Sequence, residues 1–346
     1  MPGKVTSDHK PFDYAHPPCV RALSSAEANE VDVRYLGSGG VFLGWRETAV
    51  LLGPFFTNPP PRSNLFGKFR HDRPRIAAHL RDVPLAEVRA IVTGHAHYDH
   101  LADVPIVAAE HTPAAAIYTN ASGAAMLAAY PSLRQRVHMV RPNDTFAITD
   151  AGGAAVIRIR TIASDHAPQL CRSRRWPCNI SRCEIPEPWT SGFESHPLRD
   201  FCGGETFAYV IDLLDTDGTV AFRLYYNDAA PEAPRGVPIL DGIPYDIAIL
   251  CIASFDHVQG YPEAVLRTVR PRYVLLTHYE DFFSKLEGRW RFVALLTDTK
   301  AERFVERMLK TDAIVGGLAP ETPVCGATGV GWSMPVPGEQ ARFRAK

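Results

Sequence analysis

Residues 93–101 read Thr-Gly-His-Ala-His-Tyr-Asp-His-Leu, and this stretch constrains the fold more than any other part of the chain. It directly follows an apolar, β-branched run that predicts a short buried strand. Because neighbouring side chains on an extended chain point to opposite sides, His95 and His97 can face one metal ion. Asp99 and His100, on the turn that follows, can face a second. Imidazole and carboxylate together suit Zn, Fe or Mn.

The composition is that of a globular protein. The chain has 346 residues, of which 46% are hydrophobic and 22% charged, so it can bury a core without staples. A net charge of −1 argues against a broad nucleic-acid surface, and no nucleic-acid partner is expected. No apolar run is about eighteen residues long, so no transmembrane segment is expected.

Compartment and oligomeric state stay open at this level. The first thirty residues hold no signal-peptide core, so we expect a cytoplasmic protein or, if a signal peptide precedes Met1, a periplasmic or secreted one. Seven cysteines are present, and four of them lie between residues 171 and 202. Scattered thiols and one or two disulfides across a long loop both fit, and disulfides would require an oxidising compartment.

Periodic patterns predict a layered α/β domain, because strands precede and alternate with helices in both halves. Strands are expected over 31–36, 41–45, 48–52, 88–93, 156–162, 206–212, 219–226, 247–252 and 273–277, and helices over 73–81, 103–110, 122–130, 262–269 and 301–309. No composition shift divides the chain. We therefore expect a single domain over 1–346, with a core over about 31–310, an N-terminal extension over 1–30, an inserted lid-like loop over 167–205 and a C-terminal extension over 316–346.

The motif His-x-His-x-Asp-His after a hydrophobic strand resembles the signature of the metallo-β-lactamase superfamily. The likeness extends over roughly residues 31–290. The stretches 35–41 and 97–101 resemble a branch that includes the ascorbate-6-phosphate lactonases and the phospholipase D enzymes acting on N-acyl phosphatidylethanolamine. Asn58 stands where many members of that branch have aspartate. The resemblance implies a four-layer αββα sandwich, in which two mixed β-sheets carry helices on their outer faces.

The same resemblance implies two divalent metal ions and seven ligands. One ion would be held by His95, His97 and His166, the other by Asp99, His100 and His278, and Asp228 would bridge both. Each of the later ligands follows an apolar strand, in the order of the family. Their competitors in the sequence are His111 and His138 for His166, Asp212, Asp215 and Asp217 for Asp228, and His257 for His278.

Such a centre predicts a di-metal hydrolase that uses a metal-bridging hydroxide, with Asp99 and Asp228 as its catalytic carboxylates. Zn²⁺ is expected first, with Fe and Mn as alternatives. No G-x-S-x-G or P-loop motif offers a different chemistry. A non-catalytic member that binds metal or ligand without turnover is the alternative from another class, and the full ligand set argues against it.

The substrate is expected to be a small molecule or a lipid-like ester. Arginine binds phosphate bidentately, so the basic stretch after His166 favours hydrolysis of a phosphodiester, lipid phosphodiesters included. A lactone or a carboxylic ester is the alternative, and the stretch could equally be a solvated basic loop. The candidate substrate contacts are Tyr98, Arg172, Arg174, Arg175, Trp176, Phe255 and His257, with Glu280 and Asp281 as further neighbours of a ligand.

Overall fold

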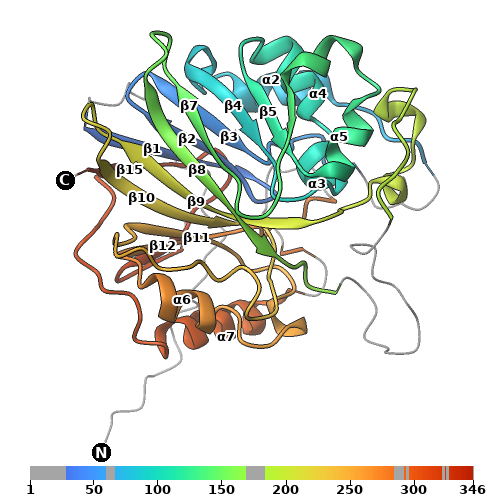
Figure 1. Ribbon diagram of the computed structural model, residues 1–346. Coiled ribbons are helices and arrows are strands. Elements are labelled where there is room, and N and C mark those ends of the chain that lie inside the picture. Colours follow the sequence, from blue (N-terminus) through green and yellow to red (C-terminus); the bar gives the residue numbers. More distant parts are fainter. Residues whose placement is uncertain are drawn as a thin grey trace, which may run out of the picture.

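Two mixed β-sheets lie face to face, and helices cover the outer face of each (Figure 1). This is the predicted αββα arrangement. The computed structural model describes residues 29–59, 67–168, 184–283, 292–293, 296–321, 324 and 327–345. Within them, every strand and helix expected from the sequence has a counterpart.

The first sheet has seven strands in the order β15-β1-β2-β3-β4-β5-β6. Strands β15 to β3 pair antiparallel, and β3 to β6 pair parallel. Their bounds are β1 Glu30–Gly37, β2 Gly40–Trp45, β3 Thr48–Leu52, β4 Val88–Val92, β5 Ala116–Thr119, β6 Val137–Met139 and β15 Gln340–Arg344.

The second sheet has eight strands in the order β13-β14-β12-β11-β10-β9-β8-β7. Strands β7 to β10 pair antiparallel, whereas β10, β11, β12 and β14 pair parallel. Their bounds are β7 Thr145–Thr149, β8 Ala155–Ser164, β9 Thr206–Leu214, β10 Val220–Asn227, β11 Ile247–Cys251, β12 Tyr273–Thr277, β13 Ala327–Gly329 and β14 Trp332–Met334.

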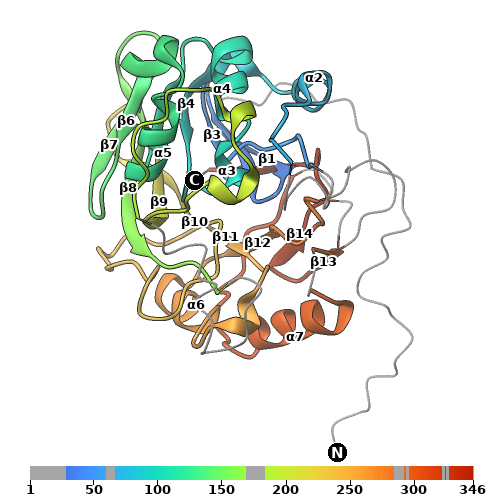
Figure 2. The ribbon, with the colours of Figure 1, turned by 90° about the vertical axis from the view of Figure 1, so that its right-hand side faces the viewer.

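Helices flank the two sheets on opposite sides, as Figure 2 shows. On the side of the first sheet lie α2 Arg73–Leu80, α3 Tyr98–Leu101, α4 Val104–Ile106, the π-helical turn Val107–His111 and α5 Ala121–Leu127. On the side of the second lie α6 Glu263–Val269 and α7 Asp298–Leu309. Short 3₁₀ turns span Leu85–Glu87, Pro131–Arg136, Phe193–Ser195, Leu198–Asp200 and Phe255–His257. None of the described helices is long and apolar enough to cross a bilayer.

The strand β3 shows why the sequence produces this layering. Alternate side chains of a strand point to opposite faces, and both faces of β3 are covered. Val50 and Leu52 belong to the core between the sheets, whereas Ala49 and Leu51 pack toward the helices. A strand that is buried on both sides therefore consists of a continuous apolar run.

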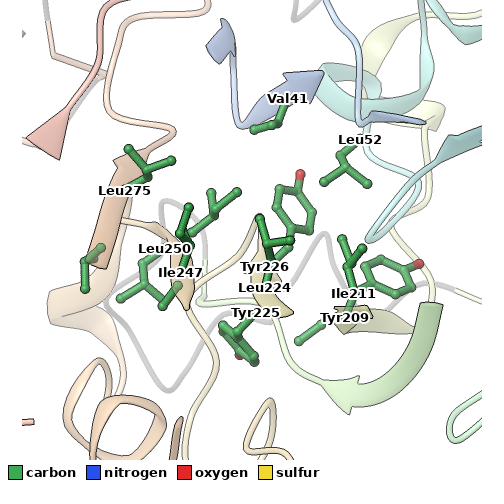
Figure 3. Close-up of a cluster of buried hydrophobic side chains, with 14 of the residues drawn as sticks. Val41, Leu52, Tyr209, Ile211, Leu224, Tyr225, Tyr226, Ile247, Leu250 and Leu275 are labelled. Carbon is green, nitrogen blue, oxygen red and sulfur yellow. The ribbon is translucent and has the colours of Figure 1, made fainter. Parts of the chain in front are cut away.

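The core between the sheets fixes their separation. Val41 and Leu52 of the first sheet face Tyr226, Leu224 and Ile211 of the second (Figure 3). All five side chains are at most 1% exposed. Full burial of each contributes about 1.5–3 kcal/mol, so this interface stabilises the packing of the two sheets against each other.

The C-terminal segment 316–346, expected to be an extension, instead supplies strands to both sheets. β14 pairs with β12, and β15 pairs with β1 over Glu30 to Arg34. Phe343 of β15 is fully buried, and its ring centroid lies 5.4 Å from that of Tyr273 in the second sheet. The segment is rich in glycine and proline, so its sequence did not predict these short strands.

Part of the segment expected to be a lid is structural as well. Phe193 and Phe201 are at most 1% exposed and pack edge-on against each other and against Trp189. They belong to the cluster that fills the space under the first sheet's helices. Of the cysteines that the structure describes, Cys202 is disulfide-bonded and Cys251 is a buried free thiol.

We expect Phe343→Ala to lower the free energy of unfolding by about 3–5 kcal/mol, because it leaves a cavity between β15 and the second sheet. Urea unfolding measures the loss. The exposed neighbour Arg344→Ala, on the same strand, should change stability by no more than about 0.5 kcal/mol. Equal small effects for both variants would show that β15 is peripheral.

Candidate metal centre

The seven expected ligands meet at one edge of the sandwich because each follows the carboxyl end of a strand. β8, β10 and β12 run in the same direction, so their carboxyl ends lie on one edge of the second sheet. Asp228 and His278 directly follow two of these ends, and His166 comes two residues after the end of β8. The loop after β4 and the first turn of α3 bring the four ligands of residues 95–100 from the first sheet.

The structure places these side chains in three overlapping groups, each with ligand atoms within 4.8 Å of one another. The first metal group is His95, His97 and His166; the second metal group is Asp99, His100 and His278. The third joins Asp228 to His95 and His100. Asp228 Oδ1 lies 3.2 Å from His95 Nδ1 and its Oδ2 lies 3.5 Å from His100 Nδ1, so Asp228 stands between the two groups.

Several ring and carboxylate atoms of this cluster are buried without a hydrogen-bond partner in the part of the chain that the structure describes. Among the described residues, no hydrogen bond reaches either ring nitrogen of His97 or His100, Nε2 of His95, Nδ1 of His278 or Oδ2 of Asp228. A buried polar atom without a partner costs about 1–3 kcal/mol, and coordination to a cation would satisfy it. Imidazole and carboxylate are the ligands that such cations prefer, so the residues fit two divalent metal ions.

The protonation states are those that bind metal. Burial lowers the pKa of His100 to about 3 and that of His166 to about 4, and it lowers the pKa of His97 as well. Burial opposes ionisation of Asp99 and Asp228, but nearby imidazoles outweigh it and hold the pKa of both carboxyls well below the usual range. At neutral pH these imidazoles are neutral and both carboxylates ionised.

His278 differs from the other imidazoles. Burial lowers its pKa, but Asp99, whose Oδ2 lies 3.5 Å from its Nε2, together with Glu280 and Asp228 outweighs burial, so the pKa is raised. The Asp99 carboxylate also lies 3.7 Å from Nε2 of His100. Asp99 therefore sits between the two imidazoles of the second metal group.

Two glycines allow the backbone to approach the ligands, and sequence reasoning missed both. A Cβ at Gly94 would lie 2.4 Å and 2.5 Å from the two carboxylate oxygens of Asp228. A Cβ at Gly203 would lie 2.6 Å from Nε2 of His97. Only glycine fits at either place. Gly94 directly precedes the histidine motif, which was the one available signal.

Asp103 is a further supporting residue that the sequence did not reveal. Its buried carboxylate accepts hydrogen bonds from the backbone N–H of Phe56 (2.7 Å) and Thr57 (2.8 Å) and from the Thr57 hydroxyl (2.6 Å). It thereby fixes the loop after β3 against the turn that follows α3. Because Asp103 lies three residues after His100, these hydrogen bonds hold the loop after β3 close to α3, the helix that carries His100.

The structure places the predicted substrate contacts in different surroundings. The Tyr98 ring lies edge-on to Phe55, and burial raises the pKa of its hydroxyl. His257 is partly exposed, with Nδ1 3.0 Å from the carbonyl oxygen of Pro168. Phe255 is fully buried and its ring lies 5.0 Å from that of Phe304 on α7, so it belongs to the core and is not available to a substrate. Arg172, Arg174, Arg175 and Trp176 lie outside the described residues.

The competing candidates for ligands stand apart from the cluster. Asp212 is ion-paired with Arg223, and Asp215 and Asp217 accept hydrogen bonds within the hairpin turn. Like them, His111, His138 and His257 belong to none of the three groups.

A cavity of about 230 Å³ opens beside His166. Ser164, Thr206 and Phe207, at the ends of β8 and β9, form part of its wall. Its charged lining among the described residues is Asp165, Glu205, Glu232 and Arg235. Three carboxylates and one guanidinium give this wall an acidic character.

Comparisons with known proteins agree with this architecture. A sequence model described as the beta-lactamase superfamily domain matches residues 49–178. No curated protein sequence matches the chain. One similar solved structure is Igni18, a metallo hydrolase from the hyperthermophilic archaeon Ignicoccus hospitalis, with 14% identity and a TM-score of 0.50 over 92% of this chain and 100% of that one.

Two further structures are similar to the same extent. An isothiocyanate hydrolase from Delia radicum gut bacteria has 14% identity and a TM-score of 0.50, over 91% of this chain and 100% of that one. CmlA, a diiron beta-hydroxylase from Streptomyces venezuelae, has 12% identity and a TM-score of 0.50, over 93% of this chain and 55% of that one. The chain therefore has the metallo-β-lactamase fold.

We expect Gly94→Ala to weaken metal binding by about 10–100-fold, because the new methyl group displaces the Asp228 carboxylate. Titration of the metal-free protein with Zn²⁺ measures the change. Gly152→Ala is the matched control, since its Cβ would meet only the side chain of Asp150, at 3.3 Å. Unchanged affinity in Gly94→Ala would contradict the close packing of backbone and ligand.

The metal-free protein should lose stability as the pH falls from 7.5 to 5. The unfolded state takes up protons on histidine below about pH 6.5, whereas folded His100 and His166 do so only near pH 3 and 4. Each contributes a loss on the order of 2 kcal/mol at pH 5, partly offset by the raised pKa of His278.

Urea unfolding at the two pH values measures this loss, and His166→Gln should reduce it. The exposed His138→Gln serves as the control and should leave the pH dependence unchanged. A metal-free protein that is equally stable at both pH values would show that the imidazoles are not held neutral.

Proposed function

We propose that this chain is a hydrolase that works with two divalent metal ions. The observation that carries the proposal is the arrangement of imidazoles and carboxylates in two groups with Asp228 between them, because several of their buried atoms have no hydrogen-bond partner among the described residues. Desolvating so many donors is costly, and a structural role for them would not require it. The similarity to metallo hydrolase structures supports the same conclusion.

The proposal assigns different roles to the residues of the two metal groups. The first metal group would hold one ion, the second metal group the other, and Asp228 would contact both. When bound, two such ions supply Lewis acidity and lower the pKa of water to near neutrality. Asp99, ionised and beside His278 and His100, is placed to accept a proton at Oδ2 from the attacking water. Zn²⁺ is the first expectation, and Fe or Mn would suit the same donors.

We further propose phosphodiesters, lipid phosphodiesters included, as the substrate class. This rests on the resemblance to the lactonase and phospholipase D branch and on the arginines that follow His166 in the sequence. The acidic wall of the cavity beside His166 favours the second candidate, a neutral lactone or carboxylic ester, because it would repel an anionic group.

The metal-loaded protein should hydrolyse a bis-aryl phosphodiester, and Asp99→Asn should lower kcat by about 10²–10⁴-fold because it removes the proton acceptor. The exposed Asp217→Asn, on the β9–β10 turn, is the matched control and should keep full activity. An aryl lactone and an aryl acetate are assayed in parallel, and metal content is measured for every variant.

Each outcome of this assay is informative. Turnover of the lactone or the acetate without turnover of the phosphodiester would leave the hydrolase proposal standing and refute the substrate preference. No turnover of any ester by a protein that holds two metals would contradict the hydrolase proposal. Equal activity of Asp99→Asn and the native chain would remove Asp99 from its role.

A further inference from the structure

A buried carboxylate behind the metal centre accepts three hydrogen bonds. Glu280 is 0% exposed and lies two residues after the ligand His278. It accepts from the hydroxyl of Tyr35 at 2.5 Å, from the backbone N–H of Tyr279 at 3.2 Å and from the backbone N–H of Ser38. Two of these donors come from the other sheet, about 240 residues earlier in the chain.

The Tyr35 hydroxyl connects Glu280 to the backbone of the ligand His278. Its hydroxyl oxygen accepts a hydrogen bond of 2.8 Å from the backbone N–H of His278. Burial and the charge of Glu280 raise the pKa of Tyr35 well above its usual value, so the hydroxyl keeps its proton and donates it to Glu280. The chain of contacts runs from the carboxylate through the phenol to the backbone of the ligand.

The backbone of His278 needs such support. Its φ of 57° lies in the left-handed region, which a residue with a side chain adopts only where its surroundings hold it. This conformation follows directly on the end of β12 and turns the imidazole toward Asp99. A hydrogen bond to the His278 N–H therefore acts on the orientation of a ligand.

Glu280 also holds the turn between β1 and β2. Its bond to the N–H of Ser38 fixes the residue before Gly39. A Cβ built at Gly39 would lie 3.2 Å from Cε1 of His100 and 3.4 Å from Cδ2 of His278, so the backbone of this turn passes close to two ligands of the second metal group.

We propose that Glu280 is a positioning residue for the second metal group, acting through Tyr35 and the Ser38–Gly39 turn on His278 and His100. The inference rests on the proposed metal centre. Of the hydrogen bonds that the structure records for Glu280 and Tyr35, none reaches the first metal group, His95, His97 and His166. We therefore expect loss of the Glu280 carboxylate to weaken binding of the second metal ion more than binding of the first.

The test is stepwise Zn²⁺ titration of the metal-free protein, with Co²⁺ absorption spectra as an independent readout of coordination. Glu280→Gln keeps the size of the side chain. It replaces one carboxylate oxygen with an amide NH₂ group, which cannot accept a hydrogen bond from the surrounding donors. We expect it to weaken the second metal ion by about 10–100-fold while the first keeps its affinity. Tyr35→Phe removes the hydroxyl that joins Glu280 to the N–H of His278, and it should shift the same metal ion in the same direction.

Asp212→Asn is the matched control, because Asp212 is a buried carboxylate that pairs with Arg223 away from the centre. It should lower stability and leave both metal affinities unchanged. Equal weakening of both metal ions in Glu280→Gln, or no weakening in either Glu280 or Tyr35 variant, would overturn the inference alone. A native chain that binds fewer than two metal ions would overturn the proposed function as well.

Discussion

The structure depends on the burial of a cluster of imidazoles and carboxylates, the candidate metal ligands, at one edge of the two sheets. Imidazoles and carboxylates at this depth lose their hydration, and several of their atoms have no hydrogen-bond partner among the described residues. That cost is of the same order as the net stability of a domain. It is tolerable here because the cluster lies at the edge of a large apolar core, which two sheets close from both sides.

The same burial determines the chemistry. In water, several imidazoles so close together would be partly protonated and would repel a cation. Enclosed at the strand ends, His97, His100 and His166 have lowered pKa values, and Asp99 and Asp228 stay ionised. The side chains are therefore already in the protonation states that bind a cation, with neutral imidazoles and ionised carboxylates. The proposed reaction class rests on this set, whereas the proposals for the substrate rest on its surroundings, such as the acidic cavity beside His166.

Close approach of the backbone completes the centre. Gly94 and Gly203 leave room for Asp228 and His97 where any side chain would collide. His278 takes a left-handed backbone conformation, and the Tyr35 hydroxyl holds its N–H. Residue type alone would not produce the site, because the backbone that orients His278 is held by a residue of another strand.

The sequence by itself determined the layered α/β fold and the ligand types, because both depend on local patterns. Apolar runs mark buried strands, and polar ligands directly after them lie at strand ends whatever the remaining topology. Only the tertiary structure decided the contacts between distant segments. Tyr35 and Glu280 meet across 245 positions, β15 closes the first sheet from the far end of the chain, and Phe255 faces α7 instead of the centre. No local pattern encodes such pairings, since they depend on how two sheets pack.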